Sequence, residues 1–216
     1  MFTIIVPVYN EENTILSVLI DLDDAFYDSQ VIVVDNSSTD TSLEIVTKFI
    51  ESFMSQSNNK FQLHNCHNPG KSNAIRSALH LVKNSVVILH DADNEYRVGE
   101  ALELARIHII ERSDMTIGVR SNKLLRSIIA NTLIRLILKM RYKKTVSDIL
   151  TGSRVVSKSL LLQCVSKEFA IETELTKLAL IQNLKIIEGP CHYKPRTIGK
   201  KIKARHMIEL LRMAIC

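Results

Sequence analysis

Short apolar runs alternate with helical patterns along the first half of the chain. Five apolar runs have the length and residue types of β-strands, and they cover residues 2–9, 31–35, 60–64, 85–90 and 114–119. Between the first four runs, apolar residues recur at helical spacing within residues 15–22, 43–50 and 74–82. Strands that alternate with helices are typical of βαβ units, so the pattern predicts an α/β fold with a mostly parallel sheet flanked by helices.

The second half of the chain has a different pattern. One long helix is predicted over residues 121–141, where apolar positions recur among arginines and lysines. The other expected elements are a hairpin around Thr151-Gly152, helices near 157–164 and 172–181, a strand at 185–189, and a basic loop at 193–205 before a last amphipathic helix. No linker or repeat divides the sequence, so we expect a single domain over residues 1–216.

Composition narrows the class of protein. The chain has 216 residues, of which 46% are hydrophobic, so it can bury one sizeable core. No window reaches the roughly 18 uninterrupted apolar residues of a membrane span, and the start of the chain lacks the basic region of a signal peptide. The four cysteines, Cys66, Cys164, Cys191 and Cys216, are far apart, which favours reduced thiols. We therefore expect a protein that faces the cytosol.

Charge is distributed unevenly between the two halves. Residues 1–119 contain 8 Lys and Arg against 17 Asp and Glu, whereas residues 120–216 contain 20 against 6. The first half is therefore suited to hold cations and the second to meet anions. Nucleic acid is a common partner of a basic segment, but only 5% of the residues are aromatic and no nucleic-acid-binding motif is present, so we expect no nucleic acid partner.

Polar clusters follow three of the predicted strands. The fourth strand runs into Asp91, Ala92 and Asp93, and ligands of parallel α/β sheets bind beyond the carboxyl ends of the strands. Two carboxylates two residues apart in an extended segment share a face and provide oxygen ligands for Mg²⁺ or Mn²⁺. Taken alone, this Asp-Ala-Asp sequence is more typical of a turn that caps a helix.

Several motifs together resemble a known family. They are VPVYNEENTI, VVDNSSTDTS, HNPGKSNAIRSAL and LHDADNE in the first half, and IGVR, SDILTGSRVVSK and IETELTKLALIQNLKIIEGPCHYKPRTIG after it. In order and spacing the sequence resembles family 2 glycosyltransferases of the GT-A fold, which is Rossmann-like, and within them the dolichyl- and polyprenyl-phosphate sugar synthases. The resemblance implies an inverting, metal-dependent hexosyltransferase that uses GDP- or UDP-hexose and a polyprenyl phosphate acceptor. Residues 1–119 would bind the donor and residues 120–216 the acceptor.

The resemblance also implies roles for individual residues. Pro7, Tyr9, Glu11 and Asp35 would hold the nucleoside. Asp91 and Asp93 would bind Mg²⁺ or Mn²⁺ and the donor diphosphate, with Ala92 between them and Glu95 beside them. The phosphates would meet Arg120, Arg196 and, in the basic loop, Lys201. This loop departs from the family pattern, because Lys200-Lys201 stands where relatives have a Ser-Lys pair.

The need for a catalytic base depends on the acceptor. A lipid phosphate is already anionic near neutral pH, whereas a sugar hydroxyl has to lose a proton. Asp148, Glu172 and Glu174 are the candidate bases, with a capping or surface role as the alternative, and Glu174 joins Asp93 and Arg196 as a predicted catalytic residue. The basic charge over residues 194–205 favours a phosphate acceptor. A transferase acting on a hydroxyl, and a nucleotide-sugar-binding protein without turnover, remain open as alternatives.

Two segments are open to either a structural or a binding role. Gly70-Lys71 could present backbone amides to an anion or form a simple helix-entry turn. The helix at 121–141 and the tail MIELLRMAIC have apolar stripes edged by Lys and Arg, which fit core packing or an interfacial helix. The basic edge favours contact with a membrane surface, and hence a peripheral location on its cytosolic face.

Overall fold

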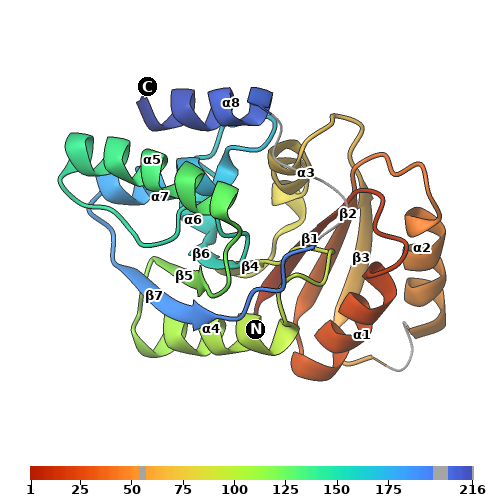
Figure 1. The fold of residues 1–216 in the computed structure, drawn as a ribbon. Coiled ribbons are helices and arrows are strands. Elements are labelled where there is room, and N and C mark those ends of the chain that lie inside the picture. Colours follow the sequence, from red (N-terminus) through yellow and green to blue (C-terminus); the bar gives the residue numbers. More distant parts are fainter. Residues whose placement is uncertain (54–56, 197–203, 216) are drawn as a thin grey trace.

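The computed structural model describes residues 1–53, 57–196 and 204–215, in which seven strands form one sheet (Figure 1). The strands are β1 (Thr3–Val8), β2 (Gln30–Asp35), β3 (Lys60–Asn65), β4 (Val86–Leu89), β5 (Met115–Arg120), β6 (Arg154–Ser157) and β7 (Ile186–Cys191). Their order is β3-β2-β1-β4-β6-β5-β7, and β6 runs antiparallel to both of its neighbours. The predicted mostly parallel α/β sheet is confirmed.

Helices cover both faces of the sheet. One face packs against α1 (Ile15–Ala25), α2 (Ser42–Phe53) and α4 (Val98–Ile110). The other face packs against α3 (Lys71–Ser77), the 3-10 helix η1 (Leu79–Leu81), α5 (Leu125–Tyr142), α6 (Lys158–Leu161), α7 (Ile171–Ile181) and α8 (Ala204–Ile215). Among the described helices, none is long and apolar enough to cross a membrane.

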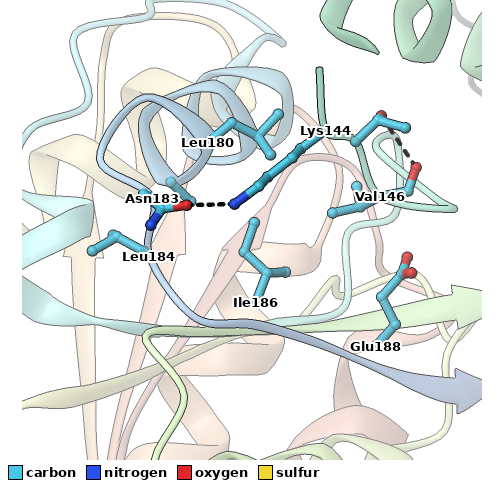
Figure 2. Close-up of a pocket in the computed structure, with 9 residues that line it drawn as sticks. Lys144, Val146, Leu180, Asn183, Leu184, Ile186 and Glu188 are labelled. Atoms are coloured by element: carbon cyan, nitrogen blue, oxygen red, sulfur yellow. Dashed lines mark hydrogen bonds between the residues drawn. The ribbon is translucent and has the colours of Figure 1, made fainter. Parts of the chain in front are cut away.

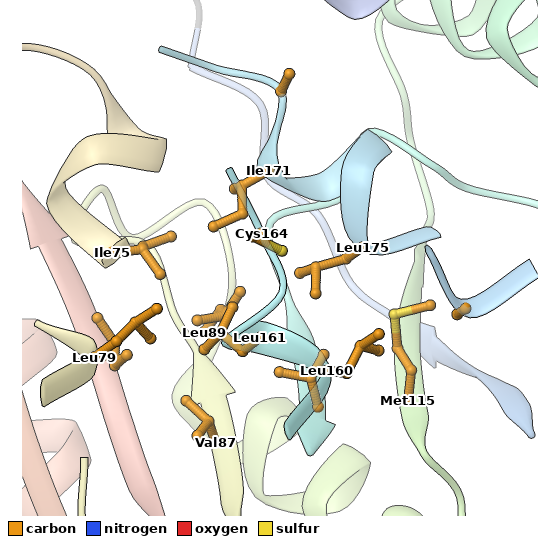
Figure 3. Close-up of a cluster of buried hydrophobic side chains, with 14 of the residues drawn as sticks. Ile75, Leu79, Val87, Leu89, Met115, Leu160, Leu161, Cys164, Ile171 and Leu175 are labelled. Atoms are coloured by element: carbon orange, nitrogen blue, oxygen red, sulfur yellow. The ribbon is translucent and has the colours of Figure 1, made fainter. Parts of the chain in front are cut away.

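The strands supply two cores because successive side chains point to opposite faces of the sheet. Val87 and Leu89 of β4 face one core, whereas Ile88 between them faces the other. Figure 3 shows the first core, where these two side chains meet Ile75 of α3 and Leu161 of α6. Burial on both faces explains why the strands read as continuous apolar runs.

Two features of the fold differ from the sequence-based expectation. The hairpin predicted around Thr151-Gly152 is wrong, because residues 145–153 form a loop and β6 pairs with the distant strands β4 and β5. Val146 and Ile149 of this loop pack into the core, so side-chain burial rather than a β-ladder holds it. Helix α4, which was not predicted, fills the connection between β4 and β5.

Candidate active site

The candidate site lies where three neighbouring strands end. β2, β1 and β4 are adjacent and parallel, so their carboxyl ends reach the same edge of the sheet. Each is followed by a residue in the left-handed region, Asn10 (φ 55°), Ser37 (φ 61°) and Asn94 (φ 59°). Such residues reverse the chain within a short loop. The three polar clusters expected from the sequence are thereby brought to one edge.

Lys71 joins two carboxylates at this edge. Its Nζ lies 2.5 Å from Oδ1 of Asp91 and 2.7 Å from Oε1 of Glu172. Burial disfavours the charged form, but the two carboxylates outweigh it and raise the pKa of Lys71 above its usual range. Lys71 is therefore a fixed cation that orients Asp91 and Glu172, a role that sequence reasoning missed. The only signal was its position directly after the Pro69-Gly70 turn that starts α3.

A glycine makes room for Asp91. A Cβ at Gly152 would lie 2.1 Å from Oδ2 of Asp91 and 2.9 Å from Nζ of Lys71. The Gly152 N–H donates to Oη of Tyr96 over 3.2 Å, which holds the glycine backbone against the site. The close approach of the 145–153 loop to Asp91 therefore requires glycine.

Arg196 reaches the same site from the far end of the chain. Its Nη2 lies 2.6 Å from Oε2 of Glu11 and 3.4 Å from Oδ2 of Asp93. Oδ1 of Asp93 accepts the backbone N–H of Glu95 over 3.1 Å. The structure thus brings three predicted site residues, Glu11, Asp93 and Arg196, into one cluster.

Glu95 holds the segment that carries Arg196. Its carboxylate accepts from Oη of Tyr193 at 3.0 Å and from the backbone N–H of Arg196 at 2.9 Å. Its backbone carbonyl accepts the N–H of Lys194 at 2.9 Å. Burial, reinforced by the negative charge of Glu95, raises the pKa of Tyr193 to about 12, so Tyr193 remains a donor. Glu95 was predicted to bind substrate, but its carboxylate is used to position the 193–196 segment.

The nucleoside residues expected from the sequence line the ends of β1 and β2. Asp35 is buried, and its Oδ2 accepts the N–H of Ser38 at 3.2 Å. Its buried Oδ1 has no hydrogen-bond partner among the described residues, so it is available to a ligand donor. Pro7 lies in β1 opposite Val34, and Tyr9 is exposed at the end of that strand. Ala92 is buried, and its carbonyl accepts from Oγ1 of Thr14 at 2.8 Å.

Arg120 and Asp148 form a buried ion pair. Nε and Nη2 of Arg120 lie 2.9 and 2.8 Å from the two carboxylate oxygens of Asp148, and Lys123 is 3.1 Å from the same carboxylate. Burial opposes ionisation of Asp148, but Arg120 outweighs it and lowers the pKa of Asp148. The predicted phosphate contact of Arg120 and the candidate base role of Asp148 do not fit this geometry, since each group satisfies the other.

Glu172 and Glu174 face opposite sides of α7, because two residues correspond to about 200° of helical rotation. Glu174 accepts the backbone N–H groups of Val165 and Ser166 at 2.8 and 2.9 Å, so both of its oxygens hold a loop. The predicted catalytic role of Glu174 therefore does not agree with its position. Glu172, beside Lys71 and Asp91, is the candidate base that lies at the site.

The donor set fits a hard divalent cation. Asp91 and Asp93 are partly exposed at the end of β4 and offer carboxylate oxygens, and Mg²⁺ is commonly held by one or two carboxylates together with substrate phosphates. Within the described residues, no group of three or more His, Cys, Asp or Glu side chains could complete a site without a ligand. Lys201, predicted to bind substrate, lies outside the described residues.

A pocket at the opposite edge of the sheet is separate from this site (Figure 2). It lies between residues 144–146, the end of α7 and the start of β7, and Nζ of Lys144 donates to Oδ1 of Asn183 across it. β7 is parallel to β5, so the beginning of β7 is at the amino edge of the sheet. None of the predicted site residues lines this pocket.

Sequence comparisons agree with the fold. Residues 3–154 match the model of the family described as Glycosyl transferase family 2. The chain is 27% identical to glycosyltransferase AglJ of Haloferax volcanii over 205 residues, which cover 91% of this chain and 64% of that protein. It is 32% identical over 123 residues to the uncharacterized protein MJ0544 of Methanocaldococcus jannaschii, covering 55% of this chain and 52% of that protein. The chain thus spans about half to two thirds of the length of these curated relatives.

Solved structures share the fold. Glucosyl-3-phosphoglycerate synthase from Mycobacterium tuberculosis in complex with UDP has a TM-score of 0.74 at 16% identity, covering 100% of this chain and 79% of that chain. The same enzyme in complex with Mn²⁺, UDP-glucose and phosphoglyceric acid has a TM-score of 0.72 at 17% identity, covering 100% and 78%. S. aureus TarS has a TM-score of 0.59 at 22% identity, covering 89% and 60%.

Proposed function

The chain belongs to glycosyl transferase family 2, and on that premise we propose that it transfers a hexose from a nucleotide sugar to the phosphate of a polyprenyl phosphate. The observation that carries the proposal is the meeting of Arg196 with Glu11 and Asp93 beside the Asp91–Lys71 pair. Carboxylates that can hold a cation and an arginine that can bind phosphate oxygens are both needed around a departing nucleoside diphosphate.

The donor half of the reaction uses the ends of β1, β2 and β4. Asp35 Oδ1 accepts an N–H of the nucleoside base, since it is the buried oxygen that has no partner among the described residues. Asp91 and Asp93 hold Mg²⁺ or Mn²⁺, which when bound neutralises charge on the diphosphate. Arg196 leaves Glu11 for the phosphates and adds a second positive charge as the bond to the sugar breaks. The Mn²⁺ and UDP-glucose bound by the M. tuberculosis enzyme support this assignment.

The acceptor half rests on chemistry that needs no base. A phosphate oxyanion attacks the anomeric carbon directly, on the face opposite the departing diphosphate, which gives an inverted product. Asp148 and Glu174 both lie in structural contacts, which is consistent with such an acceptor. Residues 120–216 contain 20 basic and 6 acidic residues, and this net positive charge attracts an anionic acceptor.

A hydroxyl acceptor is the second candidate, and the position of Glu172 favours it. Its carboxylate lies at the site beside Lys71 and Asp91, where a general base would be required. Acceptors of the two kinds make opposite demands on Glu172: a phosphate needs only its contact with Lys71, whereas a hydroxyl needs its negative charge.

Radiolabelled UDP- and GDP-hexoses test the two candidates with polyprenyl phosphate in detergent, 3-phosphoglycerate and a hydroxyl-bearing glycan as acceptors. We expect Mn²⁺-dependent transfer to polyprenyl phosphate, with Glu172→Gln lowering kcat by less than about tenfold because glutamine keeps an oxygen for Lys71. Asp93→Asn should remove the metal-dependent part of nucleotide affinity. Transfer only to the hydroxyl acceptor, abolished in Glu172→Gln with donor affinity unchanged, would establish the second candidate instead.

A further inference from the structure

The long helix α5 has apolar residues on two opposite faces. On its inner face Ala130, Ile134 and Leu138 are buried, and Ile134 and Leu138 pack into the core. Its outer face carries a second apolar stripe at helical spacing, formed by Leu125, Ile129, Leu133, Leu136 and Met140. These five side chains are 44% to 72% exposed. We call these five residues the outer face of α5. A surface helix ordinarily presents polar residues to solvent, whereas this face is apolar.

Cations border the outer face of α5. Residues 120–147 contain eight Lys and Arg and no Asp or Glu. Arg126 and Lys139 flank the apolar stripe, and Lys143 follows the end of the helix. All three are exposed, and no carboxylate in the described part of the chain forms an ion pair with them. The surface therefore combines an apolar strip with a positive rim.

Helix α8 also exposes apolar side chains. It packs against α5, and the two helices run side by side in Figure 1. Ile208 and Ile215 of α8 are each 52% exposed. α5 follows β5 after a short connection, and β5 ends at the same sheet edge as the candidate active site, because both β4 and β5 are antiparallel to β6. The apolar surface thus begins at the edge of the sheet where the donor would bind.

We propose that the outer face of α5, with Ile208 and Ile215 of α8, is a docking surface for an anionic lipid bilayer. Apolar side chains on one side of a helix enter the boundary between headgroups and acyl chains, and flanking Lys and Arg meet anionic headgroups. A second copy of this chain is disfavoured as the occupant, because a symmetric dimer would place each positive rim against its own copy. The inner face of α5 remains packed on the protein, so the helix lies along the bilayer surface.

The inference deepens the proposed function, and it depends on that function only for the reason why the protein would dock to a bilayer. A polyprenyl phosphate keeps its chain in the bilayer and its phosphate at the surface, so docking through α5 would bring that phosphate toward the sheet edge. Lipid binding itself needs neither donor nor acceptor. A binding measurement without polyprenyl phosphate therefore separates the surface from the reaction.

Co-sedimentation with phosphatidylcholine vesicles, with and without phosphatidylserine and at low and high salt, measures the docking. We expect binding to the anionic vesicles that weakens with salt. The triple variant Ile129→Gln, Leu136→Gln, Met140→Gln should lower the partition coefficient on the order of a hundredfold, because three apolar side chains no longer enter the lipid. The matched control is Ile109→Gln with Ile110→Gln at the end of α4, where both side chains are exposed (54% and 77%) and partitioning should not change.

Thermal unfolding and sedimentation velocity complete the test. The triple variant should unfold as the wild type does, because the substituted side chains are exposed, and should keep its turnover on polyprenyl phosphate in detergent if the proposed function holds. The proposal of a lipid-docking surface would be overturned if the wild type did not bind vesicles or if the triple variant bound them equally well. It would also be overturned if the wild type formed a dimer that the triple variant does not form. Vesicle binding without any sugar transfer would instead contradict the proposed function and leave the surface standing.

Discussion

Substituting Gly152 by alanine should displace Asp91 from the candidate site. The added Cβ would lie 2.1 Å from Oδ2 of Asp91, whereas an ordinary contact is at least 3.4 Å, so the carboxylate must move by about 1.3 Å. That movement breaks the 2.5 Å contact with Lys71 and misplaces the carboxylate relative to a bound cation. A misplacement of about 1 Å in a catalytic group can lower the rate by about 100-fold.

The effect on stability should be smaller than the effect on activity. Extra atoms in a packed region typically cost about 1–3 kcal/mol, and Asp91 lies at a rim where its partly exposed side chain can turn toward solvent. We therefore expect a loss of unfolding free energy near the lower end of that range. Metal-free nucleotide affinity should persist, because Asp35 is on another strand.

Calorimetric titration of UDP or GDP with and without Mn²⁺, together with turnover, measures the change. Gly99→Ala is the matched control, since nothing lies within 4 Å of its added Cβ and alanine suits the helix. The control should keep wild-type affinity and rate. If Gly152→Ala keeps the full metal-dependent affinity and turnover, the placement of Asp91 against this loop, and the site built on it, is refuted.

Three other contacts give separate predictions. Asp35→Ala should weaken nucleotide binding by about 1.5–3 kcal/mol with or without Mn²⁺, and a loss confined to Mn²⁺-containing titrations would place Asp35 in the metal shell. Asp148→Ala should lower the unfolding free energy by about 3–5 kcal/mol in denaturant titrations, since it leaves Arg120 charged and buried, whereas a change under about 1 kcal/mol would contradict that role. Burial lowers the pKa of His108, so below about pH 6.5 the unfolded chain binds a proton more readily than the folded chain, and the free energy of unfolding declines as pH falls. This decline should be less steep in His108→Leu. Equal slopes of unfolding free energy against pH in the two proteins would contradict the pKa shift.

The sequence determined the sheet and the edge that carries the site. The length and residue types of the apolar runs located the strands, and helical spacing located α1, α2 and α3. Because parallel strands end at one edge, residues placed after β1, β2 and β4 had to converge. Asp35, Asp91 and Asp93 could be predicted for that reason, since only their distance from a strand end matters.

The tertiary structure alone decided which charged groups are partners. Arg196 and Glu11 are 185 positions apart and meet only because the segment after β7 crosses to the end of β1. Glu172 and Glu174 look alike in sequence, yet the rotation of α7 sends one to Lys71 and the other to a loop.

The tertiary structure likewise decided which face of α5 is exposed. An apolar stripe edged by Lys and Arg fits burial or exposure equally, because periodicity records spacing around a helix and not what lies against it. Only the burial of Ala130, Ile134 and Leu138 in the folded chain shows which stripe is turned inward. Local pattern is set by neighbours in sequence, whereas pairing and exposure depend on the order of strands and the rotation of helices, which arise only when the chain is folded.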